Sequence, residues 1–173
     1  MSEIVTEYPH LRLDPLELRK TFGMFATGVT VITTVSSDGS RYGLTVNSFS
    51  SVSLDPPLIL WSQSIKAPSH EVFRAASRFA VNILAEDQIS VSQHFAGGQP
   101  DKFAEVATHA GAGNVPLIDG CCAYIECVTQ MMIPGGDHTV YLGRVQRISR
   151  VAKPPLVFSG GRYMCVQPYE VIA

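Results

Sequence analysis

Short segments rich in Val, Ile, Thr and Phe recur along the chain, separated by turns that contain Gly, Pro or Asp. Runs of this kind predict β-strands. The predicted strands lie at residues 29–35, 42–53, 58–61, 79–84, 123–132, 139–149 and 163–166. Asp38-Gly39, between the first two, is typical of a β-hairpin turn.

Apolar positions at helical spacing are fewer. Asp14-Pro15 is a typical helix start with Asp as the N-cap, and Leu18 and Phe22 continue that helix at a spacing of four. A second helix is predicted at residues 68–76.

Asp87 could cap a third helix that runs to Phe95, and residues 97–100 and 108–116 are predicted to be loops because they are rich in Gly and Ala. About six strands with hairpin turns and few helices indicate a mainly β fold. The architecture that we expect is an antiparallel barrel with helices at its ends.

The predicted strand at 42–53 is unusually polar. A period of two places Thr45, Asn47 and Ser51 on one face, and the other face carries Ser48 and Ser50 among valines. Short hydroxyl groups and strand N–H groups could hold the polar edge of a flavin ring, which offers several carbonyl and nitrogen acceptors. An exposed edge strand that faces water would show the same composition.

The bulk composition narrows the class of protein. With 173 residues, 46% of them hydrophobic, the chain can form one domain with a substantial core, and we expect an N-terminal extension at 1–13 and the domain at 14–173. A net charge of −2 with 13 Lys plus Arg argues against nucleic acid or an anionic membrane as the main partner.

No apolar run reaches the roughly 18 residues of a membrane span, and the first residues are polar and acidic, so we expect a cytoplasmic protein without a signal peptide. The four cysteines, at positions 121, 122, 127 and 165, have no CxxC spacing and no His at zinc-like offsets. We therefore expect no metal site, and we interpret the cysteines as small buried thiols in a reducing compartment.

Several motifs occur in the order typical of one family: FATGVTVITT at 25–34, GLTVNSFSSVSLDPPLILW at 43–61, FAVNIL at 79–84 and GGDHTVYLGRV at 135–145. They resemble the flavin reductase-like family, the FMN-binding split barrels that include the short-chain reductase components of two-component flavin-dependent monooxygenases. This resemblance implies a split β-barrel, a six-stranded antiparallel Greek-key barrel that works as a homodimer. It also implies an NAD(P)H:flavin oxidoreductase that reduces FMN or FAD and supplies the reduced flavin to a separate oxygenase. The sequence leaves FMN against FAD, and NADH against NADPH, open.

The resemblance also suggests which residues hold the flavin ring. The pyrimidine edge would be held by Thr45, Val46, Asn47 and Ser48. The end of the next strand would contribute Trp61, Ser62 and Gln63, although Trp61 could equally be an ordinary core residue. Asn82 lies in an apolar strand, where its amide needs partners, so it either contacts flavin or satisfies backbone groups.

The phosphate group is predicted at the loop that carries Ser64, Lys66 and Ser69, because a Lys supplies charge, hydroxyl groups donate, and the following helix N-terminus adds partial positive charge. A Ser N-cap with a solvated Lys is the simpler alternative. Further along the chain, Phe95, Lys102 and Phe103 resemble the family's F…DKF segment. There Lys102 could meet a flavin phosphate or pair with Asp101.

His138 is the candidate for the nicotinamide side, because it follows the Gly135-Gly136-Asp137 turn at the start of a strand. It would hydrogen-bond and orient the nicotinamide carboxamide, since hydride transfer needs stacked rings and no protein nucleophile. A surface role for a lone His in a loop is the alternative. Tyr163 matches the family's C-terminal aromatic residue near the nicotinamide.

Two other functions remain open. The barrel could store flavin, or bind another cofactor such as haem, without reductase turnover. It could also be an oxidase with fixed FMN that resembles pyridoxamine phosphate oxidases, although no loop concentrates the Arg residues that such a substrate would need. The loops at 97–116 and the segment before Asp14 are candidate covers that let cofactors exchange.

Overall fold

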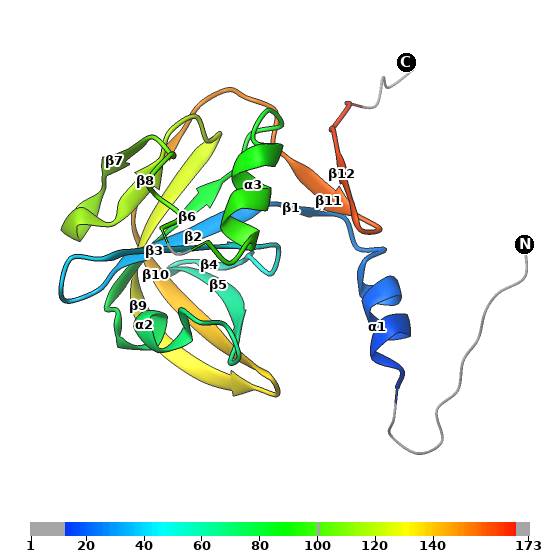
Figure 1. Ribbon diagram of the computed structural model, residues 1–173, viewed down its shortest axis with the longest axis horizontal. Coiled ribbons are helices and arrows are strands. Elements are labelled where there is room, and N and C mark those ends of the chain that lie inside the picture. Colours follow the sequence, from blue (N-terminus) through cyan, green and yellow to red (C-terminus); the bar gives the residue numbers. More distant parts are fainter. Residues whose placement is uncertain (1–12, 100, 169–173) are drawn as a thin grey trace, which may run out of the picture.

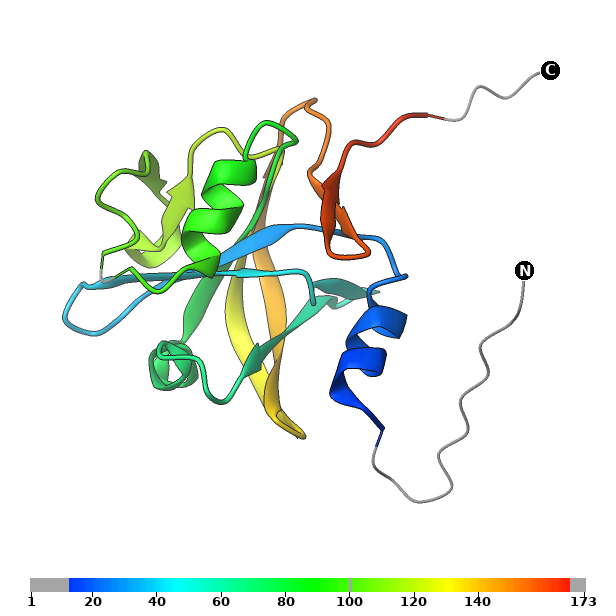
Figure 2. The same cartoon turned by 45° about the vertical axis from the view of Figure 1, so that its right-hand side comes forward.

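The computed structural model describes residues 13–99 and 101–168 (Figures 1 and 2). Most of the expected extension at 1–13 therefore lies outside the described residues. The main sheet contains β2 (Thr30–Val35), β3 (Arg41–Val46), β4 (Ser50–Leu54), β5 (Pro57–Ser64), β6 (Arg78–Ile83), β9 (Ala123–Gly135) and β10 (His138–Arg150). The prediction of a mainly β antiparallel fold is confirmed.

The main sheet has the strand order β3-β2-β6-β9-β10-β5-β4, and every neighbouring pair is antiparallel. The two end strands of this order, β3 and β4, follow each other directly in the chain, so their connection joins the two edges of the sheet (Figure 1). If β3 and β4 are counted as one bent strand, the sheet is a six-stranded barrel, because this strand belongs to both edges and so closes the sheet.

The predicted single strand at 42–53 is therefore wrong in one respect: the chain bends at residues 47–49 and exchanges partners. β3 pairs with β2, whereas β4 pairs with β5. At the bend, the Ser48 hydroxyl accepts from the Ser62 N–H at 2.9 Å and donates to the Ser62 carbonyl at 3.0 Å. The Ser48 side chain thus takes the place of a backbone partner for Ser62, and the two-residue alternation of side chains between the faces of the strand is interrupted there.

The helices are α1 (Pro15–Phe22), α2 (His70–Ala75) and α3 (Ile89–Ala96). Asp14 caps α1 as predicted, because its carboxylate accepts the Leu16 N–H at 2.9 Å. The predicted cap Asp87 is wrong: Gln88 occupies that position, and its side chain accepts the Ala85 N–H at 3.0 Å. Within the described residues, no helix is long and apolar enough to cross a membrane.

Two small sheets accompany the barrel. The predicted loop at 108–116 contains β7 (Thr108–Ala110), a 3-10 turn at Ala112–Asn114 and the start of β8 (Pro116–Ile118). A second sheet joins β1 (Thr27–Gly28), β11 (Val157–Ser159) and β12 (Arg162–Met164) in the order β1-β11-β12. Both views show α1 standing apart from the barrel, connected to it through β1.

The core has two parts. One cluster, which includes Ile32, Trp61, Phe73 and Tyr141, packs together from β2, α2, β5 and β10. The other cluster packs α3 and β8 against β2 and β6. Three cysteines, at 121, 122 and 127, are buried free thiols as predicted, whereas Cys165 is exposed.

Candidate functional site

Two pockets lie along β3 and share Ala96, the last residue of α3, in their linings. The larger pocket encloses about 850 Å³ between the β2–β3 hairpin, the start of α2 and the loop after α3. The smaller encloses about 210 Å³ between the end of β3, α3 and the β11–β12 hairpin. Together they bring several of the predicted site residues to one region of the barrel.

The smaller pocket is lined by three of the predicted ring-binding residues and not by Ser48. Thr45, Val46 and Asn47 line it together with Tyr163, which comes from the far end of the chain. The Thr45 hydroxyl donates to the Ser92 carbonyl of α3 at 2.6 Å, and the Tyr163 and Ser92 hydroxyls lie 2.9 Å apart. Because the Thr45 hydroxyl donates to α3, the donors that remain for a ligand are the exposed amide of Asn47, backbone groups and the one hydroxyl proton that the Tyr163–Ser92 pair does not share.

Trp61 belongs to the core. Its indole is fully buried, stacks on Tyr141 with ring centroids 4.4 Å apart, and meets Phe73 and Phe79 edge to face. The structure therefore favours the packing alternative for Trp61 over contact with flavin. Its neighbour Ser62 serves the Ser48 bridge through backbone atoms.

Asn82 also has a structural role. Its side chain is fully buried, its amide group donates to the Val31 carbonyl at 2.9 Å and to the Thr33 hydroxyl at 3.0 Å, and its oxygen accepts the Ile118 N–H at 2.8 Å. These bonds connect β6 to β2 and β8. The structure thus favours the backbone-satisfying alternative for this residue.

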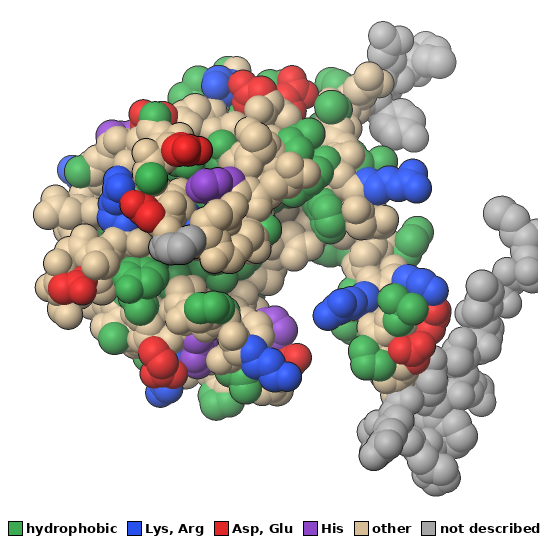
Figure 3. Space-filling model, viewed as in Figure 1, with side chains coloured by type: hydrophobic (Ala, Val, Ile, Leu, Met, Phe, Trp, Pro, Cys, Tyr) green, Lys and Arg blue, Asp and Glu red, His purple; other side chains and the backbone are tan. Residues whose placement is uncertain are grey.

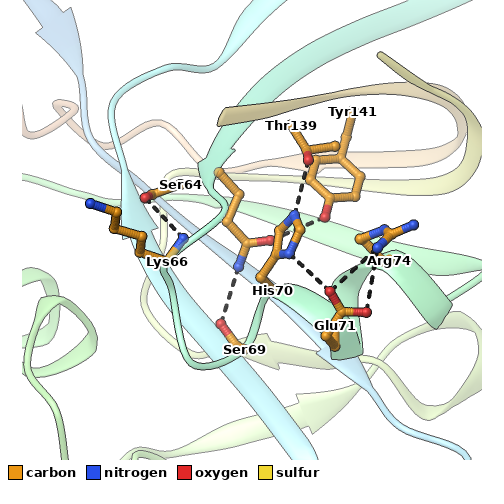
Figure 4. Close-up of polar contacts among 9 residues, drawn as sticks. Ser64, Lys66, Ser69, His70, Glu71, Arg74, Thr139 and Tyr141 are labelled. Carbon is orange, nitrogen blue, oxygen red and sulfur yellow. Dashed lines mark hydrogen bonds and ion pairs between the residues drawn. The ribbon is translucent and has the colours of Figure 1, made fainter. Parts of the chain in front are cut away.

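The predicted phosphate residues separate into two groups (Figure 4). Ser69 lines the larger pocket and occupies the N-cap position of α2, but its hydroxyl makes no cap bond and instead accepts the amide of Gln63 at 3.1 Å. Ser64 accepts the Lys66 N–H at 3.3 Å, and the exposed Lys66 side chain extends away from Ser69. The simple Ser-cap alternative therefore does not describe Ser69.

The predicted F…DKF segment forms one wall of the larger pocket. The Lys102 ammonium donates to the Phe95 carbonyl in the last turn of α3 at 2.7 Å, and Asp101 instead accepts the Phe103 N–H at 2.9 Å. Burial lowers the pKa of Lys102. Within the described residues Lys102 has no carboxylate within ion-pairing distance, so of its two alternatives the structure does not support pairing with Asp101.

Phe95 and Phe103 pack edge to face beneath Lys102, with ring centroids 5.1 Å apart. Phe95 is fully buried, and Phe103, although it lines the pocket, is only 3% exposed. Their rings support the pocket wall and offer little surface to a ligand.

His138 lines neither of these two pockets and lies beside the start of the loop that carries Ser64, Lys66 and Ser69. It begins β10, pairs with Ser64 in the strand register, and is held there by the Ile65 N–H, which donates to the Asp137 carbonyl at 3.0 Å. The imidazole Nδ1 is 2.7 Å from the Asp137 carboxylate, and this hydrogen bond lowers the pKa of Asp137. Because a carboxylate only accepts, Nδ1 carries the proton and Nε2 is left as an acceptor in the neutral ring.

A flavin fits these residues by the chemistry of the donor set. The larger pocket offers an ammonium and a guanidinium, from Lys102 and Arg41, and two hydroxyls, from Ser40 and Ser69, all suited to phosphate. The smaller pocket offers apolar walls, including Val46 and Phe158, beside the Asn47 amide, as a flat ring with one polar edge requires.

Several residues of the site were missed by sequence reasoning. Ser40 and Arg41 follow the hairpin turn into the larger pocket, and Phe158 belongs to a short strand that was not predicted. Tyr141, which donates to the Gln63 oxygen at 3.1 Å, lies in a predicted strand. Tyr141 lies two residues after Thr139, so both side chains lie on the same face of the strand. Only this position could have indicated a contact with the neighbouring strand that carries Gln63.

Comparison with known protein families matches residues 22–167 to the flavin reductase-like domain. Among characterised proteins, the chain is 43% identical over 147 residues to the reductase component of the flavin-dependent trigonelline monooxygenase of Acinetobacter baylyi, covering 85% of this chain and 47% of that protein. The chain therefore spans about half the length of that relative.

A second relative matches along most of its own length. The chain is 40% identical over 160 residues to the flavin-dependent monooxygenase reductase subunit HsaB of Mycobacterium tuberculosis, covering 91% of this chain and 85% of the relative. The structure of the NADH:FAD oxidoreductase SgcE6 of Streptomyces globisporus, in complex with NAD and FAD fragments, superposes with a TM-score of 0.86 at 40% identity, covering 91% of this chain and 95% of that one.

Proposed function

The chain belongs to the flavin reductase-like family, and we propose that it oxidises NADH, reduces FMN or FAD, and supplies the reduced flavin to a separate monooxygenase component. The proposal of NADH and of an oxygenase partner rests on the relatives, one described as an NADH:FAD oxidoreductase and two as monooxygenase reductase components.

The observation that carries the proposal is the pair of pockets that meet at Ala96. One contains the strand end predicted to hold a flavin ring, and the other contains the Ser69 hydroxyl and the Lys102 ammonium, which suit a phosphate. A flavin supplies a tricyclic ring that accepts hydride when bound, and the chain supplies the surfaces that hold and align it.

Each part of the site has a defined task. Asn47 and the backbone at the end of β3 donate to the polar edge of the ring, and α3 keeps Thr45 in place through Ser92. Lys102 and Ser69 attract and orient the phosphate. Because the two pockets are open and carry few charged side chains, we expect their affinity for flavin to be moderate, as release of the reduced flavin to a partner enzyme requires.

His138 is proposed to orient the nicotinamide. With Nδ1 donating to Asp137, the Nε2 atom can accept an N–H of the carboxamide and so fix the angle of the nicotinamide ring. Positioning of this kind contributes to turnover because two reacting rings must stack at a short distance and in one orientation.

A steady-state assay tests the function. Oxidation of NADH and of NADPH is followed at matched concentrations of FMN, FAD and riboflavin, and we expect NADH to be the better donor. If neither nicotinamide is oxidised with any flavin, the reductase proposal fails. Flavin retained through purification without turnover would indicate a storage module instead.

A pair of histidine variants tests the role of His138. His109 is a matched control, because its Nδ1 also lies against an aspartate, 2.6 Å from Asp119, and its side chain is similarly exposed. We expect His138→Ala to raise the KM for NADH about tenfold, and His109→Ala to leave it unchanged. An unchanged KM and kcat in His138→Ala would remove His138 from the site.

We also propose that the protein acts as a homodimer through its N-terminal arm, defined here as residues 13–25. Helix α1 has only eight residues and buries none of them, and Phe22, Met24 and Phe25 are 70%, 77% and 77% exposed. Figure 3 shows hydrophobic side chains on this arm, which stands away from the barrel. So short a helix is unstable without tertiary packing, so a second copy is the occupant that we expect.

The arm also adjoins the site. The Gly160 N–H, in the β11–β12 turn, donates to the Gly23 carbonyl at 2.7 Å, and the same hairpin carries Tyr163 into the smaller pocket. We expect wild-type protein to have the mass of a dimer in light scattering, and Phe22→Asp/Phe25→Asp to be monomeric. Ile148→Asp, at an equally exposed apolar position on β10, is the control that should stay dimeric. A monomeric wild type would refute the proposal.

A further inference from the structure

A directed chain of hydrogen bonds runs from the barrel core to the larger pocket (Figure 4). The Tyr141 hydroxyl donates to the Gln63 oxygen at 3.1 Å, and the Gln63 amide nitrogen donates to the Ser69 hydroxyl oxygen at 3.1 Å. Tyr141 and Gln63 are 0% and 1% exposed, whereas Ser69 lines the pocket. The chain therefore connects two buried side chains to a hydroxyl that a ligand can reach.

The direction of these bonds determines what Ser69 offers to a ligand. Because its oxygen accepts from Gln63, the hydroxyl proton of Ser69 is free to point into the pocket and donate. If the Gln63 amide were turned over, its oxygen would face Ser69 and accept the hydrogen bond from the Ser69 hydroxyl. Ser69 would then present only lone pairs to the pocket, which repel an anion.

Tyr141 selects the first arrangement. Burial raises its pKa to about 12, so the hydroxyl keeps its proton at neutral pH. The tyrosine ring is held by stacking on Trp61, with centroids 4.4 Å apart and an interplanar angle of 9°. In the turned-over arrangement the Gln63 amide nitrogen would face Tyr141, and the buried Tyr141 hydroxyl proton would lose its acceptor. The Gln63 oxygen therefore faces Tyr141, because an unpaired buried donor is unfavourable.

Two features separate this arrangement from ordinary packing. Ser69 occupies the N-cap position of α2 yet makes no side-chain cap bond, so its hydroxyl does not serve the helix. Gln63 is buried on the same face of β5 as Ile59 and Trp61, at a position where an apolar residue would otherwise be expected.

We propose that Gln63 and Tyr141 are positioning residues that orient the Ser69 hydroxyl as a donor to the flavin phosphate. This inference rests on the proposed function only in taking the phosphate to be that of a flavin. It assigns no catalytic role to either residue, because neither reaches the pocket.

Binding of FMN is compared with binding of riboflavin, which has the same ring and no phosphate, by calorimetric titration of the full chain. Wild-type protein should prefer FMN, and Ser69→Ala should lose about tenfold of that preference. Tyr141→Phe, which removes only one oxygen atom, should lose about threefold while riboflavin affinity stays unchanged. In the Ser69→Ala background, Tyr141→Phe should have no further effect, because its influence acts through Ser69.

Thr129→Val is the matched control, since the Thr129 hydroxyl also holds α2, through the Ala76 carbonyl at 3.2 Å, at the end away from the pocket. It should leave the FMN preference intact. The proposal is overturned if Tyr141→Phe weakens FMN and riboflavin equally, if it weakens FMN by the same factor with and without Ser69, or if wild-type protein binds the two flavins equally. NADH oxidation by wild-type protein tests the reductase function separately, since these titrations need no turnover.

Discussion

Replacing Gly43 by Ala tests how closely α3 packs on β3 beside the larger pocket. A Cβ atom at Gly43 would lie 2.6 Å from one Phe95 ring carbon and 3.2 Å from Phe103, whereas ordinary contact begins at 3.4 Å, so the Phe95 ring must move by about 0.8 Å. Phe95 is fully buried and packs edge to face on Phe103, so it has no free space to move into.

Overpacking of this kind costs about 1–3 kcal/mol. For a domain of this size, about 2 kcal/mol lowers the melting temperature by about 4–8 °C. Thermal and urea unfolding would measure the change at matched protein concentration, because the proposed dimer would make stability depend on concentration. We also expect weaker binding of FMN, since Lys102 is anchored to the Phe95 carbonyl.

Gly28→Ala is the control for this experiment. A Cβ at Gly28 would have no atom within 4 Å, and its φ lies outside the left-handed region. Its stability should be unchanged or raised by up to about 1 kcal/mol, because Ala restricts the unfolded chain. If Gly43→Ala unfolds within about 0.5 kcal/mol of wild type, the close packing of α3 on β3 described here is wrong.

Further predictions concern Cys165, Lys102 and Asp14. Only Cys165 of the four cysteines is exposed, and burial raises the pKa of Cys127 to about 12. Folded protein should therefore react with one equivalent of a thiol reagent and denatured protein with four. A second equivalent that reacts fast in the folded state would contradict this prediction. Lys102→Met should weaken FMN about tenfold and riboflavin little. Because burial lowers the pKa of Lys102, the wild-type preference for FMN should decline as pH rises toward that pKa, and a preference independent of pH would exclude the ammonium from phosphate binding. Asp14→Ala removes the hydrogen bond that the Asp14 carboxylate accepts from the Leu16 N–H, a cap worth about 1 kcal/mol. Amide exchange in α1 should therefore accelerate, and an unchanged exchange rate would contradict the role of this cap.

Local signals in the sequence predicted much of the fold. The hairpin at Asp38-Gly39 forms because Gly39 adopts a φ of 86° while the Asp38 carboxylate accepts the Ser40 N–H at 2.9 Å. The Asp14 cap and the buried strand at 79–84 were predicted for equally local reasons, namely a side chain that satisfies a helix N–H and a short apolar run. Such features depend on neighbours in the chain, so one sequence is sufficient to find them.

The site was predicted in part. The motifs predicted Thr45 and Asn47 at the flavin ring and Tyr163 near the nicotinamide, and the structure brings these three residues to the lining of one pocket. Their proximity depends on the β11–β12 hairpin packing beside α3, since the Tyr163 hydroxyl meets Ser92. No local pattern specifies that contact, because it joins segments far apart in the chain.

By itself, then, the sequence determined the family, the β-rich class, the Asp38-Gly39 turn and the Asp14 cap, because each of these depends on residue types and spacing within a few positions. The tertiary structure decided which polar residues face a ligand. Asn82 and Trp61 are enclosed by neighbouring strands, Ser48 bridges to Ser62, and Ser69 bonds to Gln63 and does not cap α2. The physical reason is that a polar side chain bonds to whichever partner packing brings within reach, and packing is a property of the whole fold.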